Sequence, residues 1–278
     1  MIKEKKVIFV TGLPRAMTTL MCNVLTNNPR IGGGETSPLL EYFYGARLNY
    51  SSTPEVKSML TKEIVDKAFF SFCYQGMQGY ANSITDKEIY LDKSRGHLHF
   101  YPFLKKFYPE AKVIVMVRDL RSVISSFEKK WRQFPEVMDS RENHEKVDFI
   151  TVSQRVNYYL NQAPLLQAVA RINNAIETGT INKMCVIKAE DFTRNPELMM
   201  RKVYDYLEEP YFELDYDNVQ QTTIENDRID AFGIYGDHLI KSKIQSETKD
   251  YLQTLGTPMC NKIAQDFSWF YDHFKYQK

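Results

Sequence analysis

The feature that most constrains the fold is an apolar run near the start of the chain that ends in a tight turn and leads into a helical pattern. Residues Val7 to Thr11 form the run, and Gly12-Leu13-Pro14 interrupts it. Thr18 to Asn28 then has helical character and stops before Pro29. A short, continuously apolar run predicts a strand buried on both faces of a parallel sheet. The chain therefore begins with a strand, a tight loop and a helix.

The same order of elements recurs along the chain. Further strands are predicted at Ile89–Leu91, Lys112–Val117 and Met184–Lys188. Helices are predicted at Pro54–Tyr80 (one or two), Tyr101–Tyr108, Leu120–Phe134, His144–Ile176 with a break at Pro164, Glu197–Leu207 and Pro258–Phe274, and residues 211–246 are expected to be irregular. Strands that alternate with helices predict an α/β fold with a parallel sheet flanked by helices on both faces. The 278 residues show no repeat or linker, so we expect one domain over residues 1–278.

Composition excludes several classes of protein. The 36 basic and 35 acidic residues leave a net charge of +1, so neither a nucleic-acid partner nor a membrane surface is expected. No run approaches the ~18 apolar residues of a membrane span, and the apolar run at Val7–Val10 is too short for a signal peptide. The four cysteines form no CxxC pair and are expected to be buried free thiols in a reducing, cytoplasmic location.

The loop between the first strand and the first helix has the chemistry of a phosphate cradle. Such a junction directs backbone N–H groups and the helix dipole at an anion. Thr18 and Thr19 add hydroxyl donors, and Arg15 adds a charge. Aligned on Gly12 with the nucleotide triphosphatase loop G-x-x-x-x-G-K-[ST], the second Gly is Met17 and the Lys is Thr18, which makes a poor ATP·Mg²⁺ site. An ordinary strand-to-helix turn is the alternative.

A second anion site is predicted after the strand at Lys112–Val117. Arg118 follows this strand, at the end where α/β sheets bind ligands. Ser122, Ser126 and Lys130 are spaced four apart, so they share one face of the following helix. The alternative is a solvated helix face with a structural salt bridge.

Together these residues resemble the sulfotransferases that use 3′-phosphoadenosine 5′-phosphosulfate (PAPS). The family's 5′-phosphosulfate loop commonly reads Pro-[Lys/Arg]-Ser-Gly-Thr-Thr, and this chain has Pro14-Arg15-Ala16-Met17-Thr18-Thr19. The family's 3′-phosphate motif is an Arg after a strand and a Ser eight residues on, which Arg118 and Ser126 match. The chain departs at Ala16-Met17, where Met in place of Gly requires helical dihedral angles.

The resemblance implies a P-loop-like α/β fold, and an enzyme that transfers a sulfuryl group from PAPS to an acceptor hydroxyl without a metal and releases PAP (adenosine 3′,5′-bisphosphate). Arg15 and Lys93 are the implied leaving-group cations, since the family's Lys also ends a short strand. His238 and Lys241 lie in a segment that resembles the late loop that closes over PAPS. The implied donor-binding residues are Arg15, Ala16, Met17, Thr18, Thr19, Arg118, Ser126, Lys130, His238 and Lys241.

The general base is a separate question. Cytosolic sulfotransferases have a His two residues after the strand-end Lys, where this chain has Arg95. Tyrosylprotein sulfotransferases place a catalytic Glu before a Thr soon after the first helix, and Gly32-Gly33-Gly34-Glu35-Thr36 matches that arrangement with a one-residue shift. Glu35 is therefore the predicted catalytic base, with a helix-cap role as the alternative. His97 and His99 are the other candidates.

The acceptor class stays open at this point. A small molecule, a carbohydrate, a lipid or a tyrosyl peptide can each supply the hydroxyl, and assembly as a homodimer also stays open. One alternative function is a P-loop-type nucleoside or small-molecule kinase, which the missing Lys at Thr18 disfavours. The other is a non-catalytic module that binds a bisphosphorylated nucleotide, which Glu35 and Lys93 disfavour.

Overall fold

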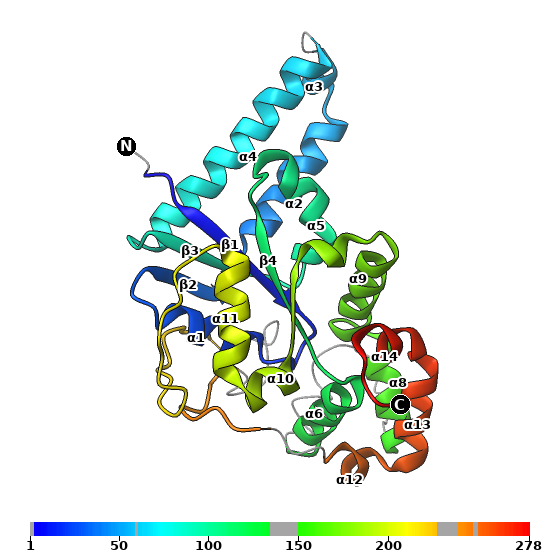
Figure 1. Ribbon diagram of the computed structural model, residues 1–278. Helices are drawn as coiled ribbons and strands as arrows, with labels where there is room; N and C mark the ends of the chain where they lie inside the picture. The colour runs from blue at the N-terminus through cyan, green and yellow to red at the C-terminus, as the bar shows by residue number, and fades with distance from the viewer. Residues whose placement is uncertain (1–2, 59–60, 134–149, 227–237, 247–249) are drawn as a thin grey trace.

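A parallel sheet forms the centre of the protein. The structure is a computed structural model that describes residues 3–58, 61–133, 150–226, 238–246 and 250–278. Its strands are β1 (Lys6–Gly12), β2 (Ile31–Thr36), β3 (Ile89–Lys93), β4 (Lys112–Val117) and β5 (Cys185–Lys188). They lie in the order β2-β3-β1-β4-β5 and all pair in parallel (Figure 1). The predicted α/β fold is confirmed.

Helices cover the sheet on both faces. The connection from β1 to β2 and the connection from β3 to β4 cross the sheet in opposite directions, so right-handed crossovers place α1 and α5 on opposite faces. No helix within the described ranges is both long and apolar enough to cross a membrane. The helices are α1 (Thr18–Thr26), α2 (Leu39–Ser52), α3 (Pro54–Ser58), α4 (Lys62–Ile84), α5 (His97–Phe107), α6 (Leu120–Gln133), α8 (Val152–Asn161), α9 (Leu165–Glu177), α10 (Ala189–Arg194), α11 (Pro196–Leu207), α12 (Tyr251–Leu255), α13 (Thr257–Asp266) and α14 (Ser268–Phe274), with a short 3₁₀ helix at Thr180–Lys183.

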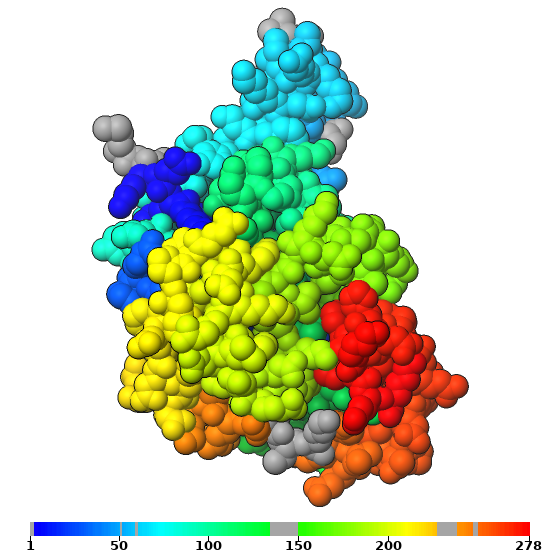
Figure 2. Space-filling view, in the orientation of Figure 1, coloured from blue at the N-terminus to red at the C-terminus, as the bar shows by residue number. Residues whose placement is uncertain are grey.

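The core lies along β1 and β4, whose side chains are buried on both faces. Residues 7–10 and 113–117 are at most 1% exposed, which explains their uninterrupted apolar sequence. Gly12 ends β1 with a φ of 146°, and a Cβ atom there would lie 2.1 Å from the carbonyl oxygen of Met116. Only glycine lets the chain turn this close to β4. Figures 1 and 2 show that α4 and α2 extend away from the sheet as a projecting arm.

Several elements differ from the sequence-based predictions, among them the short helices α10 and α12, which were not predicted. The strand β2 was not predicted, because Gly32-Gly33-Gly34 has no strand propensity. These glycines let the edge strand bulge, with φ of 91° at Gly33 and 99° at Gly34. The helix α2 was also not predicted. The single helix predicted at Pro258–Phe274 is wrong, since the chain bends at Phe267 between α13 and α14.

The other predicted elements are confirmed within a few residues. The long helical region breaks around Pro164 into α8 and α9, as expected, and residues 144–149 lie outside the described residues. The predicted strands at Lys112–Val117 and Met184–Lys188 correspond to β4 and β5. All four cysteines are free and buried, as predicted. Burial raises the pKa of the Cys22 thiol to about 12, so this thiol is protonated at neutral pH.

Candidate active site

A wide cavity lies at the carboxyl ends of the central strands. It has a volume of about 1020 Å³ and is lined by the loop after β1, by Lys93 at the end of β3 and by Arg118 after β4. The connections that leave β1 and β4 run toward opposite edges of the sheet. Ligands of open α/β sheets bind at such a switch point, because the diverging connections leave a crevice there. The remaining walls come from α6, from the α8–α9 region and from residues 238–246.

The loop after β1 is held by backbone hydrogen bonds. Leu13 N donates to the carbonyl oxygen of Met116 at 3.0 Å, and Ala16 N donates to that of Leu13 at 3.3 Å. The helical dihedral angles expected for Met17 are wrong: Met17 has φ 64° and ψ 28°, the left-handed conformation that a glycine adopts without cost. The left-handed conformation of Met17 turns the chain into α1, and it costs this residue a backbone strain of roughly 1–2 kcal/mol.

The loop presents some of its predicted residues to the cavity and not others. Arg15, Met17, Thr18 and Thr19 line the cavity, as the phosphate-cradle prediction requires. The side chain of Ala16 is fully buried in the core instead. Any contribution of Ala16 to anion binding therefore has to come from its backbone.

The two predicted anion sites are in direct contact. The Nε atom of Arg15 donates to Oγ of Ser126 at 3.0 Å, and an Nη atom of Arg118 donates to the carbonyl oxygen of Arg15 at 2.5 Å. Lys130 lines the same cavity. Ser122 lies elsewhere, in a separate cavity of about 360 Å³. The predicted helix face is thus divided between two cavities: Ser126 and Lys130 line the large cavity, and Ser122 lines the small one.

Positive charge is concentrated around the large cavity although the whole chain is nearly neutral. Asp250, the acid that lines it within the described ranges, is paired with Lys129. Desolvation and the neighbouring Arg171 lower the pKa of Arg95. The basic residues that line the cavity are Arg15, Lys93, Arg95, Arg118, Lys129, Lys130, Lys241 and Lys243, and His238 lies beside them.

Lys93 ends β3, as predicted, and its charge is balanced by an acid that sequence reasoning missed. Its Nζ atom forms an ion pair with Oε1 of Glu225, and the two side chains are only 8% and 7% exposed. The same oxygen accepts a hydrogen bond from Thr36 N at 3.2 Å. Glu225 lies in the irregular late region and belongs to no motif, so nothing in the sequence indicated that it would pair with Lys93.

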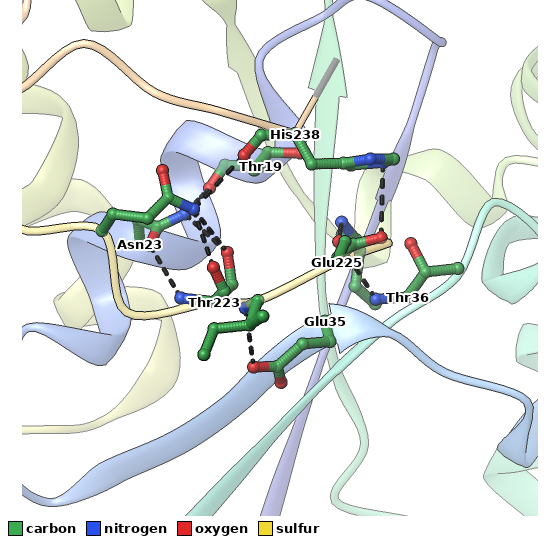
Figure 3. Close-up of polar contacts among 10 residues, drawn as sticks. Thr19, Asn23, Glu35, Thr36, Thr223, Glu225 and His238 are labelled. Carbon is green, nitrogen blue, oxygen red and sulfur yellow. Dashed lines mark hydrogen bonds and ion pairs between the residues drawn. The ribbon is translucent and has the colours of Figure 1, made fainter. Parts of the chain in front are cut away.

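Glu35 lies close to this ion pair but turns a different way. Its carboxylate accepts a hydrogen bond from Ile224 N at 3.3 Å, whereas the adjacent residue, Thr36, lines the cavity. Figure 3 shows Glu35 directed at the backbone ahead of Glu225, while Glu225 is directed at Thr36 and His238. The helix-cap alternative for Glu35 is wrong, because α2 begins at Leu39 and Pro38 occupies its cap position.

The two histidines proposed as alternative bases do not line the cavity. His97 is buried, and its Nε2 atom lies 2.7 Å from Oδ1 of Asp92. Asp92 also accepts a hydrogen bond from the Tyr90 hydroxyl at 2.9 Å, so this pair is part of the core. His99 is exposed on α5. Among the described residues, no three His, Cys, Asp or Glu side chains are grouped as a metal site.

Comparison with known proteins agrees with this geometry. Residues 7–213 match a family model described as "Sulfotransferase family". The chain is 25% identical over 222 residues to "Protein-tyrosine sulfotransferase A" of Caenorhabditis elegans, covering 73% of this chain and 50% of that protein. It is 30% identical over 132 residues to "Protein-tyrosine sulfotransferase 1" of Danio rerio, covering 45% of this chain and 36% of that protein. The chain thus spans half or less of the length of these relatives.

Solved structures show the same fold. A sulfotransferase domain from the curacin biosynthetic pathway matches with a TM-score of 0.54 and 18% identity, covering 96% of this chain and 98% of that one. The sulfotransferase STF9 from Mycobacterium avium matches with a TM-score of 0.55 and 17% identity, covering 98% of this chain and 78% of that one. At this level of identity the likeness concerns the arrangement of the strands and helices.

Proposed function

This chain belongs to the sulfotransferase family, and we propose that it transfers a sulfuryl group from PAPS to an acceptor hydroxyl, in line and without a metal. One observation carries the proposal. Two anion-binding elements, at the carboxyl ends of β1 and β4, touch each other through Arg15, Ser126 and Arg118 on one cationic cavity. A nucleotide with phosphates at both its 5′ and 3′ positions is the ligand that such a pair of sites suits.

In this proposal the loop after β1 holds the 5′-phosphosulfate, and Arg118 with Ser126 holds the 3′-phosphate. The backbone N–H groups at the start of α1 and the hydroxyls of Thr18 and Thr19 supply hydrogen bonds to the first group. Lys130, His238 and Lys241 line the same cavity and add positive charge around the nucleotide. Charge-assisted contacts of this kind are the strong ones in anion recognition.

The chemistry is a single displacement at sulfur. The acceptor oxygen forms a bond to sulfur, and the bond from sulfur to the bridging oxygen breaks, leaving its electron pair on the phosphate of PAP. Arg15 and Lys93 neutralise the charge that develops on that oxygen. We propose that the proton of the acceptor hydroxyl passes to Glu35, whose carboxylate has to turn from Ile224 N toward the cavity that the adjacent Thr36 lines.

The acceptor is proposed as a hydroxyl compound, with a tyrosyl peptide as the first to assay because of the relatives found. Aromatic and apolar side chains from α6, α8 and α9 line one wall of the cavity, among them Phe127, Tyr158, Tyr159 and Leu165. Such a wall suits either an aromatic acceptor or the adenine ring. A kinase is disfavoured, because Thr18 stands where an ATP-binding loop has its lysine.

The proposal predicts that PAP stabilises the protein without added metal. A ligand that binds only the folded state, at 100 to 1000 times its Kd, adds about 2.7–4.1 kcal/mol. Thermal unfolding is measured with PAP, with adenosine 5′-monophosphate, which lacks the 3′-phosphate, and with ATP·Mg²⁺. A large shift with PAP and a small one with the other two nucleotides is expected. A shift with ATP·Mg²⁺ and none with PAP contradicts the proposal.

Replacing Arg118 by alanine is expected to weaken donor binding more than it slows chemistry, because the proposed 3′-phosphate contact is remote from sulfur. Loss of one charge-assisted contact costs ~1.5–3 kcal/mol, which corresponds to about a 10- to 150-fold rise in the Kd for PAP. Calorimetry gives the Kd, and kcat is measured at saturating PAPS. Arg201→Ala is the control, because Arg201 pairs with Glu197 on the exposed face of α11. Unchanged affinity with a collapse of kcat contradicts the assigned role.

A further inference from the structure

A late segment of the chain, residues 220–225, is held along α1 by the side chains of Asn23 in that helix and of Asn27 at its C-cap. Asn27 exchanges two hydrogen bonds with the backbone of Gln220, at 2.9 and 3.1 Å. The Oδ1 atom of Asn23 accepts from the backbone N–H groups of Thr222 and Thr223 at 2.6 and 3.1 Å. Asn23 and Asn27 lie one turn apart, so both face the late segment. The two asparagines satisfy its backbone much as a neighbouring strand would, and Figure 3 shows Asn23 directed at Thr223.

The late segment ends with Glu225 inserted between two residues that line the cavity. Oε1 of Glu225 pairs with Lys93, and Oε2 lies 3.4 Å from Nε2 of His238. The side chain of His238 is 17% exposed, against 7% for Glu225. The amide of Gln221 adds a second connection, because its Oε1 atom accepts from Ile240 N at 2.9 Å and its Nε2 atom donates to the carbonyl oxygen of His238 at 3.3 Å.

Glu225 is an unusual residue to find behind an anion site. A buried carboxylate repels a phosphosulfate placed beside it, so this charge weakens donor binding. The same charge fixes the Nζ atom of Lys93, which otherwise moves freely on a flexible four-carbon stem. It also lies beside the His238 imidazole at 3.4 Å, where a carboxylate can orient a histidine ring.

We propose that Glu225 is a positioning residue of the transfer centre, which holds Lys93 toward the leaving oxygen and His238 toward the reactants at the expense of donor affinity. This inference rests on the proposed function, because it needs a donor anion in the cavity. The other ionisable groups near Glu225 are Arg95 at the cavity wall, Cys22 on α1 and Glu35 on β2. Cys22 carries no charge at neutral pH, as its raised pKa requires.

The test is Glu225→Gln, which keeps the size of the side chain and removes its charge. We expect kcat to fall by about 10- to 100-fold, the scale of losing a partner that orients a functional group. The Kd for PAP should stay the same or decrease, because a repulsive charge is gone. The matched control is Glu209→Gln: Glu209 also pairs with two cations, Lys6 at 2.7 Å and Arg30 at 2.8 Å, at the opposite end of the sheet. Its variant should keep kcat and PAP affinity.

A double-mutant cycle separates positioning from general damage. Because Glu225 acts partly through Lys93, Glu225→Gln should lower kcat by a clearly smaller factor in a Lys93→Met background than in the wild-type protein. Losses that multiply in the double variant overturn the inference, and so does a Glu225→Gln variant whose kcat stays within twofold of wild type. A Kd for PAP that rises in parallel with the loss of kcat also overturns it, because that is the result of a merely structural residue.

A second variant keeps the test decisive if Glu225→Gln fails to fold. Glu225→Asp retains the charge but shortens the side chain, so it cannot reach Lys93 and His238 together. We expect about a tenfold loss of kcat with PAP affinity within threefold of wild type; wild-type turnover overturns the inference. The proposed function fails separately, when wild-type protein does not bind PAP at all.

Discussion

Lys93→Met is expected to lower kcat by about 10²–10³-fold, the usual effect of removing one group that stabilises developing charge. Lys93 ends β3 at the cavity, and it lies on the opposite side of β1 from Arg118, because β3 and β4 flank β1 in the sheet. A cation at this position can meet the leaving oxygen while Arg118 holds the remote phosphate. The loss should therefore appear in kcat more than in the Kd for PAP.

Stability has to be measured on the same variant, because Lys93→Met leaves Glu225 buried without its partner. Breaking a buried pair by removing one member typically costs about 3–5 kcal/mol, so turnover is assayed well below the melting temperature. The control is Lys5→Met: Lys5 lies just before β1, is also buried, and its Nζ atom donates to the carbonyl oxygen of Lys87. Equal turnover in the two variants contradicts the role assigned to Lys93.

Glu35→Gln is expected to lower turnover by ~10²–10⁴-fold, the usual contribution of a general base. The substitution separates chemistry from structure, because the glutamine carbonyl oxygen can still accept the hydrogen bond from Ile224 N. The melting temperature and the Kd for PAP should therefore stay close to the wild-type values. Glu35→Ala removes both the base and the contact, and it should also lower the melting temperature.

Near-normal turnover in Glu35→Gln, with a lower melting temperature only in Glu35→Ala, shows that Glu35 is an anchor for the late segment. The search for a base then moves to His238, which lines the cavity, rather than to His97 or His99, which do not. His97 is already engaged by Asp92 in the core, so His97→Ala would mainly report on stability.

Local sequence was sufficient for the elements whose pattern depends on near neighbours. The strands β1 and β4 could be predicted because residues buried on both faces must be apolar without interruption. The loop at Gly12–Thr19 and the strand-end Arg118 followed from these strands, and helical periodicity placed Ser126 and Lys130 on one face. The same local reasoning failed at β2, because its three glycines have low strand propensity. It also failed at Met17, because residue type gives no indication of the left-handed conformation found there.

Tertiary structure decided which of these residues meet. The position of β1 between β3 and β4 brings Lys93, Arg15 and Arg118 to one cavity, and strand order arises from contacts between distant parts of the chain. Glu225 lies 132 residues from the lysine that it pairs with. Its place depends on Asn23 and Asn27 holding the late segment along α1, through hydrogen bonds that cross about 190 to 200 residues. No local pattern encodes such a pairing, because the residues at its two ends are ordinary helix and loop residues until the fold brings them together.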